Sequence, residues 1–209
     1  MIDQALLTEI QYALLEPPDG GQSWPSEIWT HDEAVGVVAE SERQLLRKTH
    51  LLVTRVELPI VALATSVSLP SDWLATAHLV WRDLVGRRTP LAPIDLTEAD
   101  LGSPTWETVA AQPQAYRDSG GESLTLQLVP TPDTNGTIEL LYIAAPPEVN
   151  GNGRAFTVPD EYLSAVKYGA LSMLLRKVGR LLDHDRATYC EQREALTHEL
   201  AEIVLGGFA

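Results

Sequence analysis

Histidine and cysteine are the residues of this chain with the greatest capacity for chemistry, and their spacing argues against an active site. None of the five histidines forms the HxxxH or HExxH spacing of a zinc hydrolase; they are His31, His50, His78, His184 and His198. We interpret His184 and His198 as exposed or capping residues of a C-terminal helix. Neighbouring residues on a helix point in different directions, so Asp183-His184-Asp185 predicts a polar break between two helices.

The single cysteine offers no better candidate. Cys190 has arginines and glutamates at helical spacing but no neighbouring histidine to act as its base, so we expect a small, inert side chain. Gly151-Asn152-Gly153-Arg154 lacks the strand and helix that flank a phosphate-binding loop, and the chain has no GxSxG or GxxxxGK motif. We therefore predict no catalytic residue, no metal, no cofactor and no enzymatic activity.

Composition narrows the choice of partners. The chain has 209 residues and is 44% hydrophobic, which is typical of a globular protein. Its formal charge is -14, so its general surface is not expected to hold nucleic acid or an anionic membrane. One cysteine excludes an internal disulfide. The first residues lack the basic region of a secretion signal, and no apolar stretch approaches the roughly 20 residues of a membrane span.

Charge is distributed unevenly along the chain. Residues 1 to 42 contain nine acidic residues and neither Lys nor Arg, whereas basic residues begin at Arg43. One interpretation is a solvated acidic face. The other is charge pairing between copies of the chain, in which an acidic N-terminus meets a basic patch; its candidate residues are Glu9, Asp32, Glu33, Arg43 and Arg47.

Helical signals occupy both ends of the chain. Apolar residues at spacings of three and four predict a helix over the first fifteen residues, and a second helix begins at Thr30, where Thr30 and Glu33 form a capping pattern, and runs to about Lys48. In the last third, Pro159 opens a helix whose period continues to Leu182. A further helix follows, running through residues 189 to 204 before the glycines at 206 and 207.

The middle of the chain has the composition of strands. Val, Leu and Thr predict strands near 51–57, 60–69, 74–82, 123–129 and 137–144, and Asp133 to Gly136 predict a hairpin between the last two. Prolines and glycines divide the stretch from Arg87 to Gly121, where we expect only a short helix near Thr97–Leu101.

The order of elements predicts an α+β fold, in which helices from both chain ends pack together around an inserted, antiparallel, strand-rich lobe. The expected domains are residues 1–50 for the N-terminal helices, 51–150 for the β-rich lobe, and 151–209 for the C-terminal helices that complete the helical domain.

A succession of short motifs adds a resemblance to this outline. The motifs, in chain order, are Val67-Ser68-Leu69-Pro70-Ser71-Asp72-Trp73, Gln112-Pro113-Gln114-Ala115-Tyr116, Leu128-Val129-Pro130-Thr131-Pro132, Ile138-Glu139-Leu140-Leu141-Tyr142, Val158-Pro159-Asp160-Glu161-Tyr162 and Gly179-Arg180-Leu181-Leu182-Asp183. From about residue 56 to 190 this succession resembles the head-to-tail adaptor (connector) proteins of tailed phages, the group that includes tail tubular protein A.

The resemblance implies a structural protein of the virion, made in the host cytoplasm and placed at the head–tail junction. Members of the family form a homo-oligomeric ring, commonly dodecameric, that joins the portal protein to the tail nozzle or other tail proteins. DNA passes through the ring, and acidic walls would let it slide because they repel phosphate. The resemblance also implies portal docking by a C-terminal segment, whose alternative is a frayed terminus; it consists of Leu205, Gly206, Gly207, Phe208 and Ala209.

Two other functions stay open at the level of sequence. A neck or tail-completion protein would contact only tail-side proteins, with no direct portal contact. A virion-associated hydrolase would need a metal site or a pair of carboxylates in a cleft, and the chain has no residues with that spacing.

Overall fold

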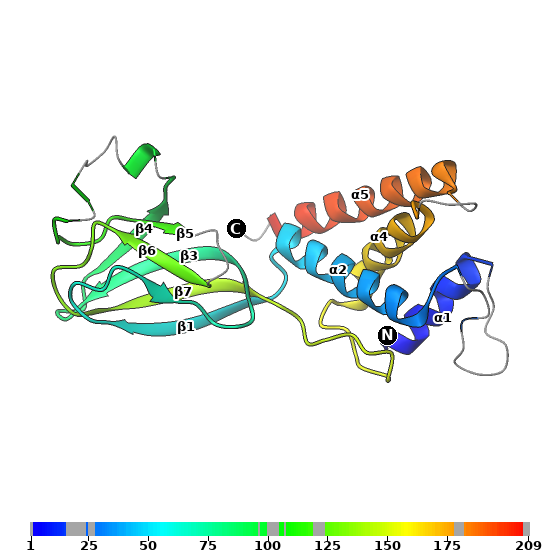
Figure 1. Ribbon diagram of the computed structural model, residues 1–209, viewed down its shortest axis with the longest axis horizontal. Coiled ribbons are helices and arrows are strands. Elements are labelled where there is room, and N and C mark those ends of the chain that lie inside the picture. Colours follow the sequence, from blue (N-terminus) through cyan, green and yellow to red (C-terminus); the bar gives the residue numbers. More distant parts are fainter. Residues whose placement is uncertain are drawn as a thin grey trace. The chain divides into compact units, whose positions relative to one another are not determined.

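A computed structural model describes residues 2–15, 24, 28–95, 97–99, 105–106, 108–118, 124–177 and 182–206. The chain divides into two compact units. Residues 1–52 and 145–209 form a helical unit, and residues 53–144 form a sheet unit. The predicted α+β class is confirmed, because helices from both chain ends pack together and a mostly antiparallel sheet lies between them in sequence (Figure 1).

The helical unit is organised around its most apolar helix. It contains α1 (Asp3–Ala13), α2 (His31–Thr49), the 3-10 turn η1 (Asp160–Tyr162), α4 (Leu163–Leu175) and α5 (His184–Gly206). The helix α4 contacts α1, α2 and α5, and most of its side chains are buried. Burial of apolar surface on α4 therefore contributes to the stability of this unit.

Side-chain caps mark the starts of two helices, and the sequence predicts the first of them. The Oγ1 of Thr30 accepts a hydrogen bond from the backbone N–H of Glu33 at 3.2 Å, which begins α2. A carboxylate oxygen of Asp183 accepts from the N–H of Arg186 at 3.0 Å, which caps the start of α5. Because α4 ends at Leu175 and His184 and Asp185 belong to α5, the two helices separate before the predicted break. Buried Trp29, just before α2, donates its indole N–H to the carbonyl of Leu174 at 3.1 Å.

The predicted helix from Pro159 to Leu182 is too long. The α-helix α4 ends at Leu175, where Arg176 is the C-cap residue, and the backbone N–H of Asp183 reaches back to the carbonyl of Leu175. Leu182 is exposed, and Val178 and Leu181 lie outside the described residues.

Among the described residues, the sheet unit has seven strands in the order β1-β7-β3-β4-β5-β6-β2. Their bounds are β1 (Val53–Ile60), β2 (Val67–Ser68), β3 (Trp73–Asp83), β4 (Arg88–Pro93), β5 (Ala115–Asp118), β6 (Thr125–Val129) and β7 (Gly136–Ala144). All neighbouring pairs are antiparallel except β4 with β5. The longest pairing joins β3 to β7, whose inward residues form the core of this unit.

The predicted hairpin between the last two strands is wrong. The strand β6 pairs with β5 and β2, whereas β7 pairs with β1 and β3, so residues 130 to 135 cross between separate parts of the sheet. Asn135 does not form the expected turn; its side-chain oxygen instead accepts a hydrogen bond from the N–H of Ala62 at 2.8 Å. Gly136 is needed for space, because a Cβ there would lie 2.4 Å from the indole ring of Trp81.

Two further strand predictions need correction. In the predicted strand 60–69, Ile60 is the last residue of β1 and Val67–Ser68 form β2, since the chain turns after Ile60. The proline-rich stretch after Arg87 contains β4 and β5, which the sequence patterns missed because both strands are short and β4 carries two prolines. Residues 97–99 are helical, and Leu101 lies outside the described residues.

Candidate functional site

His198 is buried, contrary to the prediction that it is exposed or caps a helix. Its side chain lies between α5 and α2, with only 6% of its surface exposed. Its Nδ1 is 3.3 Å from Nζ of Lys48, and its Nε2 is 3.9 Å from a carboxylate oxygen of Glu194. Burial and the charge of Lys48 lower the pKa of His198, against the smaller opposite effect of Glu202. Burial raises the pKa of Glu194. His184 is exposed, as predicted.

The lowered pKa of His198 predicts a loss of stability in mild acid. Below pH 6.5, the ordinary pKa of histidine, the His198 side chain is protonated more fully in the unfolded chain than in the folded chain. The free energy of unfolding should therefore fall as the pH falls through that value. We expect the free energy of unfolding of the wild type to fall further than that of His198→Gln between pH 7.5 and 5.5. Denaturant unfolding at several pH values measures this difference. An exposed control, His184→Gln, should track the wild type, and parallel pH profiles for wild type and His198→Gln would contradict the prediction.

Cys190 and the glycine-rich loop have structural roles. Cys190 is buried on α5, and burial raises the pKa of its thiol, which disfavours the reactive thiolate. The backbone N–H groups of Gly151 and Gly153 donate to the buried carboxylate of Asp3 at 2.9 and 2.8 Å. The loop therefore holds a carboxylate of its own chain.

The predicted charge-pairing residues have different surroundings. Two of the acids already have lysine partners within the chain: Glu9 pairs with Lys167 and Glu33 pairs with Lys177, each at 2.7 Å.

The remaining three residues of that prediction lie at the surface of α2. Asp32 is near His31 at 3.5 Å, and Arg43 is near Glu40 at 3.8 Å. Arg47 is exposed, and its guanidinium has no ion pair among the described residues. Charge pairing between copies stays a prediction, for which Asp32 and Arg47 are the residues least engaged within the chain.

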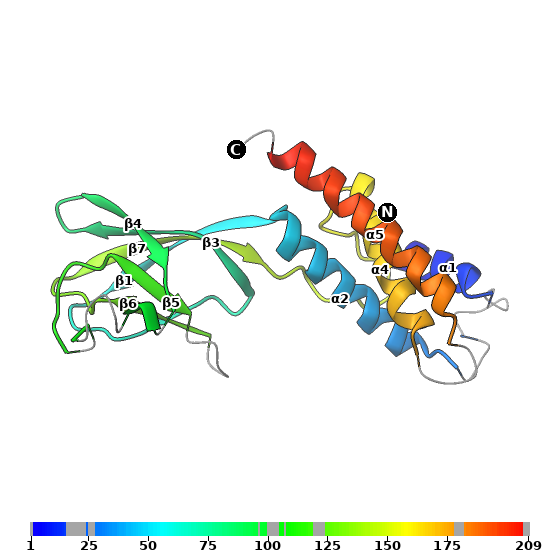
Figure 2. The same cartoon turned by 90° about the horizontal axis from the view of Figure 1, so that it is seen from above.

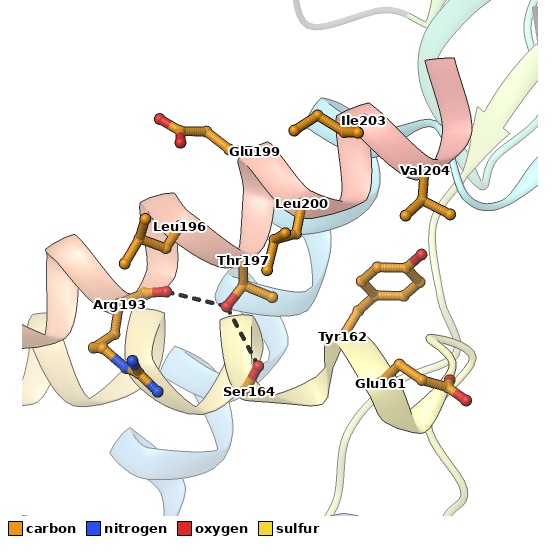
Figure 3. Close-up of a pocket in the computed structure, with 10 residues that line it drawn as sticks. All are labelled: Glu161, Tyr162, Ser164, Arg193, Leu196, Thr197, Glu199, Leu200, Ile203 and Val204. Atoms are coloured by element: carbon orange, nitrogen blue, oxygen red, sulfur yellow. Dashed lines mark hydrogen bonds between the residues drawn. The ribbon is translucent and has the colours of Figure 1, made fainter. Parts of the chain in front are cut away.

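A groove along α5 forms a hollow surface on the helical unit. It has a volume of about 670 Å³ and is bounded by the outer side of α5 and the start of α4. Figure 3 shows Leu200 and Val204 directed toward the ring of Tyr162, with Glu161 and Glu199 at opposite edges. The hydroxyl of Thr197 is 3.4 Å from that of Ser164 and donates to the Arg193 carbonyl, so the polar groups of the floor are satisfied.

Apolar residues of the groove are unusually exposed for a helix of a folded unit. The large side chains on this outer face of α5 have half or more of their surface exposed; they are Leu196, Leu200, Ile203 and Val204. The helix packs inward through Ala187, Cys190, His198 and Ala201. The sequence patterns did not single out this outer face, because apolar residues lie on both sides of α5. An apolar surface of this kind is typical of a protein–protein contact.

A second exposed apolar surface lies at one end of the sheet. Ile60, the last residue of β1, and Asp83, the last residue of β3, both pair with Gly136 of β7. The turns that follow β1 and β3 therefore lie at the same end of these strands. These turns carry four exposed large side chains, which we call the sheet tip: Val61, Leu63, Leu84 and Val85. The turn between β3 and β4 is visible in Figure 2. Sequence patterns did not single out the sheet tip.

Arginines line the strands that lead to the sheet tip. Glu139 on β7, which is almost fully buried, forms ion pairs with Arg55 at 3.0 Å and Arg82 at 3.3 Å, and with Arg88. Neighbouring Glu57 pairs with Arg82 at 2.7 Å. Three arginines around two glutamates leave this face with a net positive charge in an otherwise acidic protein.

The C-terminal docking segment is only partly described. Leu205 and Gly206 belong to the last turn of α5, and Gly207, Phe208 and Ala209 lie outside the described residues. Docking by this segment stays a prediction.

The described residues favour a protein that works through contacts with other proteins. Across these residues, no three or more His, Cys, Asp or Glu side chains gather in a way that could hold a metal ion. No helix in the described part of the chain has the length and apolar character to span a membrane. The groove and the sheet tip, both apolar and exposed, instead define the class of an interaction protein.

Comparison with known proteins identifies the family. Residues 4–203 match the sequence model of the SU10 adaptor protein family. The chain therefore belongs to the SU10 adaptor protein family, and the resemblance to phage head-to-tail adaptor proteins is confirmed.

Solved structures and curated proteins add little to this assignment. The chain is similar to a chain of a structure described as the neck of an empty GTA particle computed with C6 symmetry, with 15% sequence identity and a TM-score of 0.30. The similarity covers 92% of this chain and 91% of that chain. The search of curated proteins finds no match.

Proposed function

We propose that this protein is a structural component of the head–tail junction of a tailed phage, where copies of the chain form a ring that joins the portal to the tail. The observation that carries the proposal is the family match over residues 4–203, which includes parts of both the helical unit and the sheet unit. An adaptor needs surfaces for neighbouring subunits and for proteins above and below it. The groove, the sheet tip and the C-terminal segment Leu205–Ala209 are candidates for these surfaces.

The charge of the chain suits a channel for DNA. A formal charge of -14 on each subunit would be multiplied in a ring, and an acidic wall repels phosphate. DNA would then pass through the ring without being held to it, and no sequence-specific contact is required.

The proposal is tested by mixing the purified chain with its portal particle, followed by imaging and mass determination of the product. The expected result is a symmetric ring of this protein bound beneath the portal. Truncation after Val204, which removes the predicted docking segment, is expected to weaken portal binding about tenfold or more while far-UV circular dichroism stays unchanged.

Two outcomes would redirect the proposal. If the wild type stays free of the portal but binds purified tail proteins, it is a neck or tail-completion protein that contacts only the tail side. If it binds neither, the assignment to the junction is wrong for this chain. Unchanged portal binding by the truncated variant would remove Leu205–Ala209 from the interface.

A further inference from the structure

The groove requires an occupant with an apolar centre and positive charge near it. Its exposed interior is apolar, through Leu200, Ile203 and Val204. Three charged residues line it: Glu161 and Glu199, which are exposed and make no ion pair with the described residues, and Arg193, whose guanidinium lies 5.5 Å from the centre of the Tyr168 ring. The lining therefore has one more negative charge than positive charge. A partner that covered the groove would place its own side chains against these carboxylates, so a basic partner is favoured.

The turn between β3 and β4 has this chemistry. Leu84 and Val85 are 77% and 93% exposed at its apex. Arg87 follows at once, and its guanidinium has no ion pair or hydrogen bond among the described residues. Arg88, the next residue, is also exposed.

The turn is also held in one conformation. A side-chain oxygen of Asp83 accepts from the backbone N–H of Val85 at 3.0 Å and from that of Arg87 at 2.8 Å. Gly86 has a φ of +88°, a conformation that L side chains rarely adopt, which explains glycine at this position. A turn that is already ordered loses little entropy when it is bound, so the exposed pair of side chains is suited to insertion into a groove.

We propose that Leu84 and Val85 of one copy insert into the α5 groove of a second copy, with Arg87 against Glu199. The inference rests on the proposed function in one respect: repeated contacts of this kind between copies would build the proposed ring. The two surfaces differ, so the contact is heterologous, and each copy can donate its turn to one neighbour while it receives the turn of another. Closure of such a series gives a ring.

Variants that exchange the charges of Arg87 and Glu199 test whether these two residues pair between copies. Arg87→Glu and Glu199→Arg place like charges together, and each is expected to lower the number of subunits bound per portal particle about tenfold at a concentration where the wild type assembles. The double variant exchanges the charges and is expected to recover most of the assembly. Glu148→Arg, which reverses an exposed acid outside the groove, is the matched control.

Disulfide trapping tests the contact without the portal. A chain with Val85→Cys and Ile203→Cys is expected to form a ladder of linked multimers under mild oxidation, because each copy carries both halves of the contact. The native Cys190 is buried and does not compete. Val109→Cys combined with Ile203→Cys is the control, since Val109 is exposed in the sheet unit but lies outside the turn.

The outcomes separate the inference from the proposed function. A ladder together with rescue by the double variant supports the contact. Absence of the ladder, or single charge variants that assemble as well as Glu148→Arg, overturns the contact even if the wild type forms a ring on the portal. A ladder from a chain that does not bind the portal would retain the contact and overturn the function.

Discussion

Replacement of Arg154 by Met is expected to lower the free energy of unfolding of the helical unit by about 3–5 kcal/mol, because it leaves a buried carboxylate without its partner. Glu42 on α2 is completely buried. A guanidinium nitrogen of Arg154 contacts both of its carboxylate oxygens, at 3.0 and 2.9 Å. The backbone N–H of Thr157 donates to the same carboxylate at 3.3 Å, so the loop before α4 is tied to α2 through this group.

The loss should depend on pH in a defined direction. Burial raises the pKa of Glu42 even though Arg154 and the hydrogen bond from Thr157 act to lower it. Without Arg154 the charged form is still less favourable in the folded state. The variant should therefore be least stable, relative to the wild type, near neutral pH and should regain stability as the pH falls and Glu42 takes up a proton.

Denaturant unfolding of wild type and Arg154→Met at several pH values checks this expectation. Lys167→Met is the matched control, since it removes the partly exposed pair with Glu9 and should cost no more than about 1 kcal/mol. A loss for Arg154→Met no larger than that of the control would mean that water or a rearranged side chain satisfies Glu42. Combined replacement by Arg154→Met and Glu42→Leu should recover much of the stability, because no buried charge remains.

Gly136→Ala is expected to destabilise the sheet unit by about 3 kcal/mol through overpacking. A Cβ at this position would lie 2.4 and 2.5 Å from two carbons of the Trp81 ring and 2.8 Å from the carbonyl oxygen of Arg82. Trp81 has 1% of its surface exposed and lies between packed strands, so the ring has no free space to enter.

Gly36→Ala provides the control for this substitution. Gly36 lies within α2, and a Cβ there meets no atom within 4 Å. Alanine favours the helix, so this variant should gain about 0.5–1 kcal/mol. Thermal unfolding followed by near-UV circular dichroism, which reports on the tryptophans, measures both. Equal stability of Gly136→Ala and wild type would show that β3 and β7 separate at low cost near the tip.

The family and the fold class could be predicted from sequence because they depend on short patterns of residues and on the order of these patterns along the chain. Apolar residues at helical spacing and the cap at Thr30 act within one or two turns of helix, so they predict helices without knowledge of the rest of the chain. The order of helices and strands then predicts the class. The resemblance to the adaptors likewise depends on short motifs in order along the chain.

Contacts between distant segments could not be predicted in this way. Strands β6 and β7 are adjacent in sequence and look like a hairpin, yet β6 pairs with β5 and β2, and β7 pairs with β1 and β3. Glu42 and Arg154 are 112 residues apart, and no local pattern marks them as a pair. The helix α5 has apolar residues on both of its faces. Only its packing against α4 therefore decides that Ala201 is buried and Leu200 is exposed.

The sequence alone thus determined that this protein has helices at both ends, strands between them and the motifs of a phage adaptor. Tertiary structure alone decided which strands pair, which charges are buried and which apolar side chains remain exposed for partners. The physical reason is that helix caps and periodicity depend on interactions over a few residues. Burial instead depends on the sum of contacts made by the whole fold, and a residue's own neighbours in sequence do not contain that information.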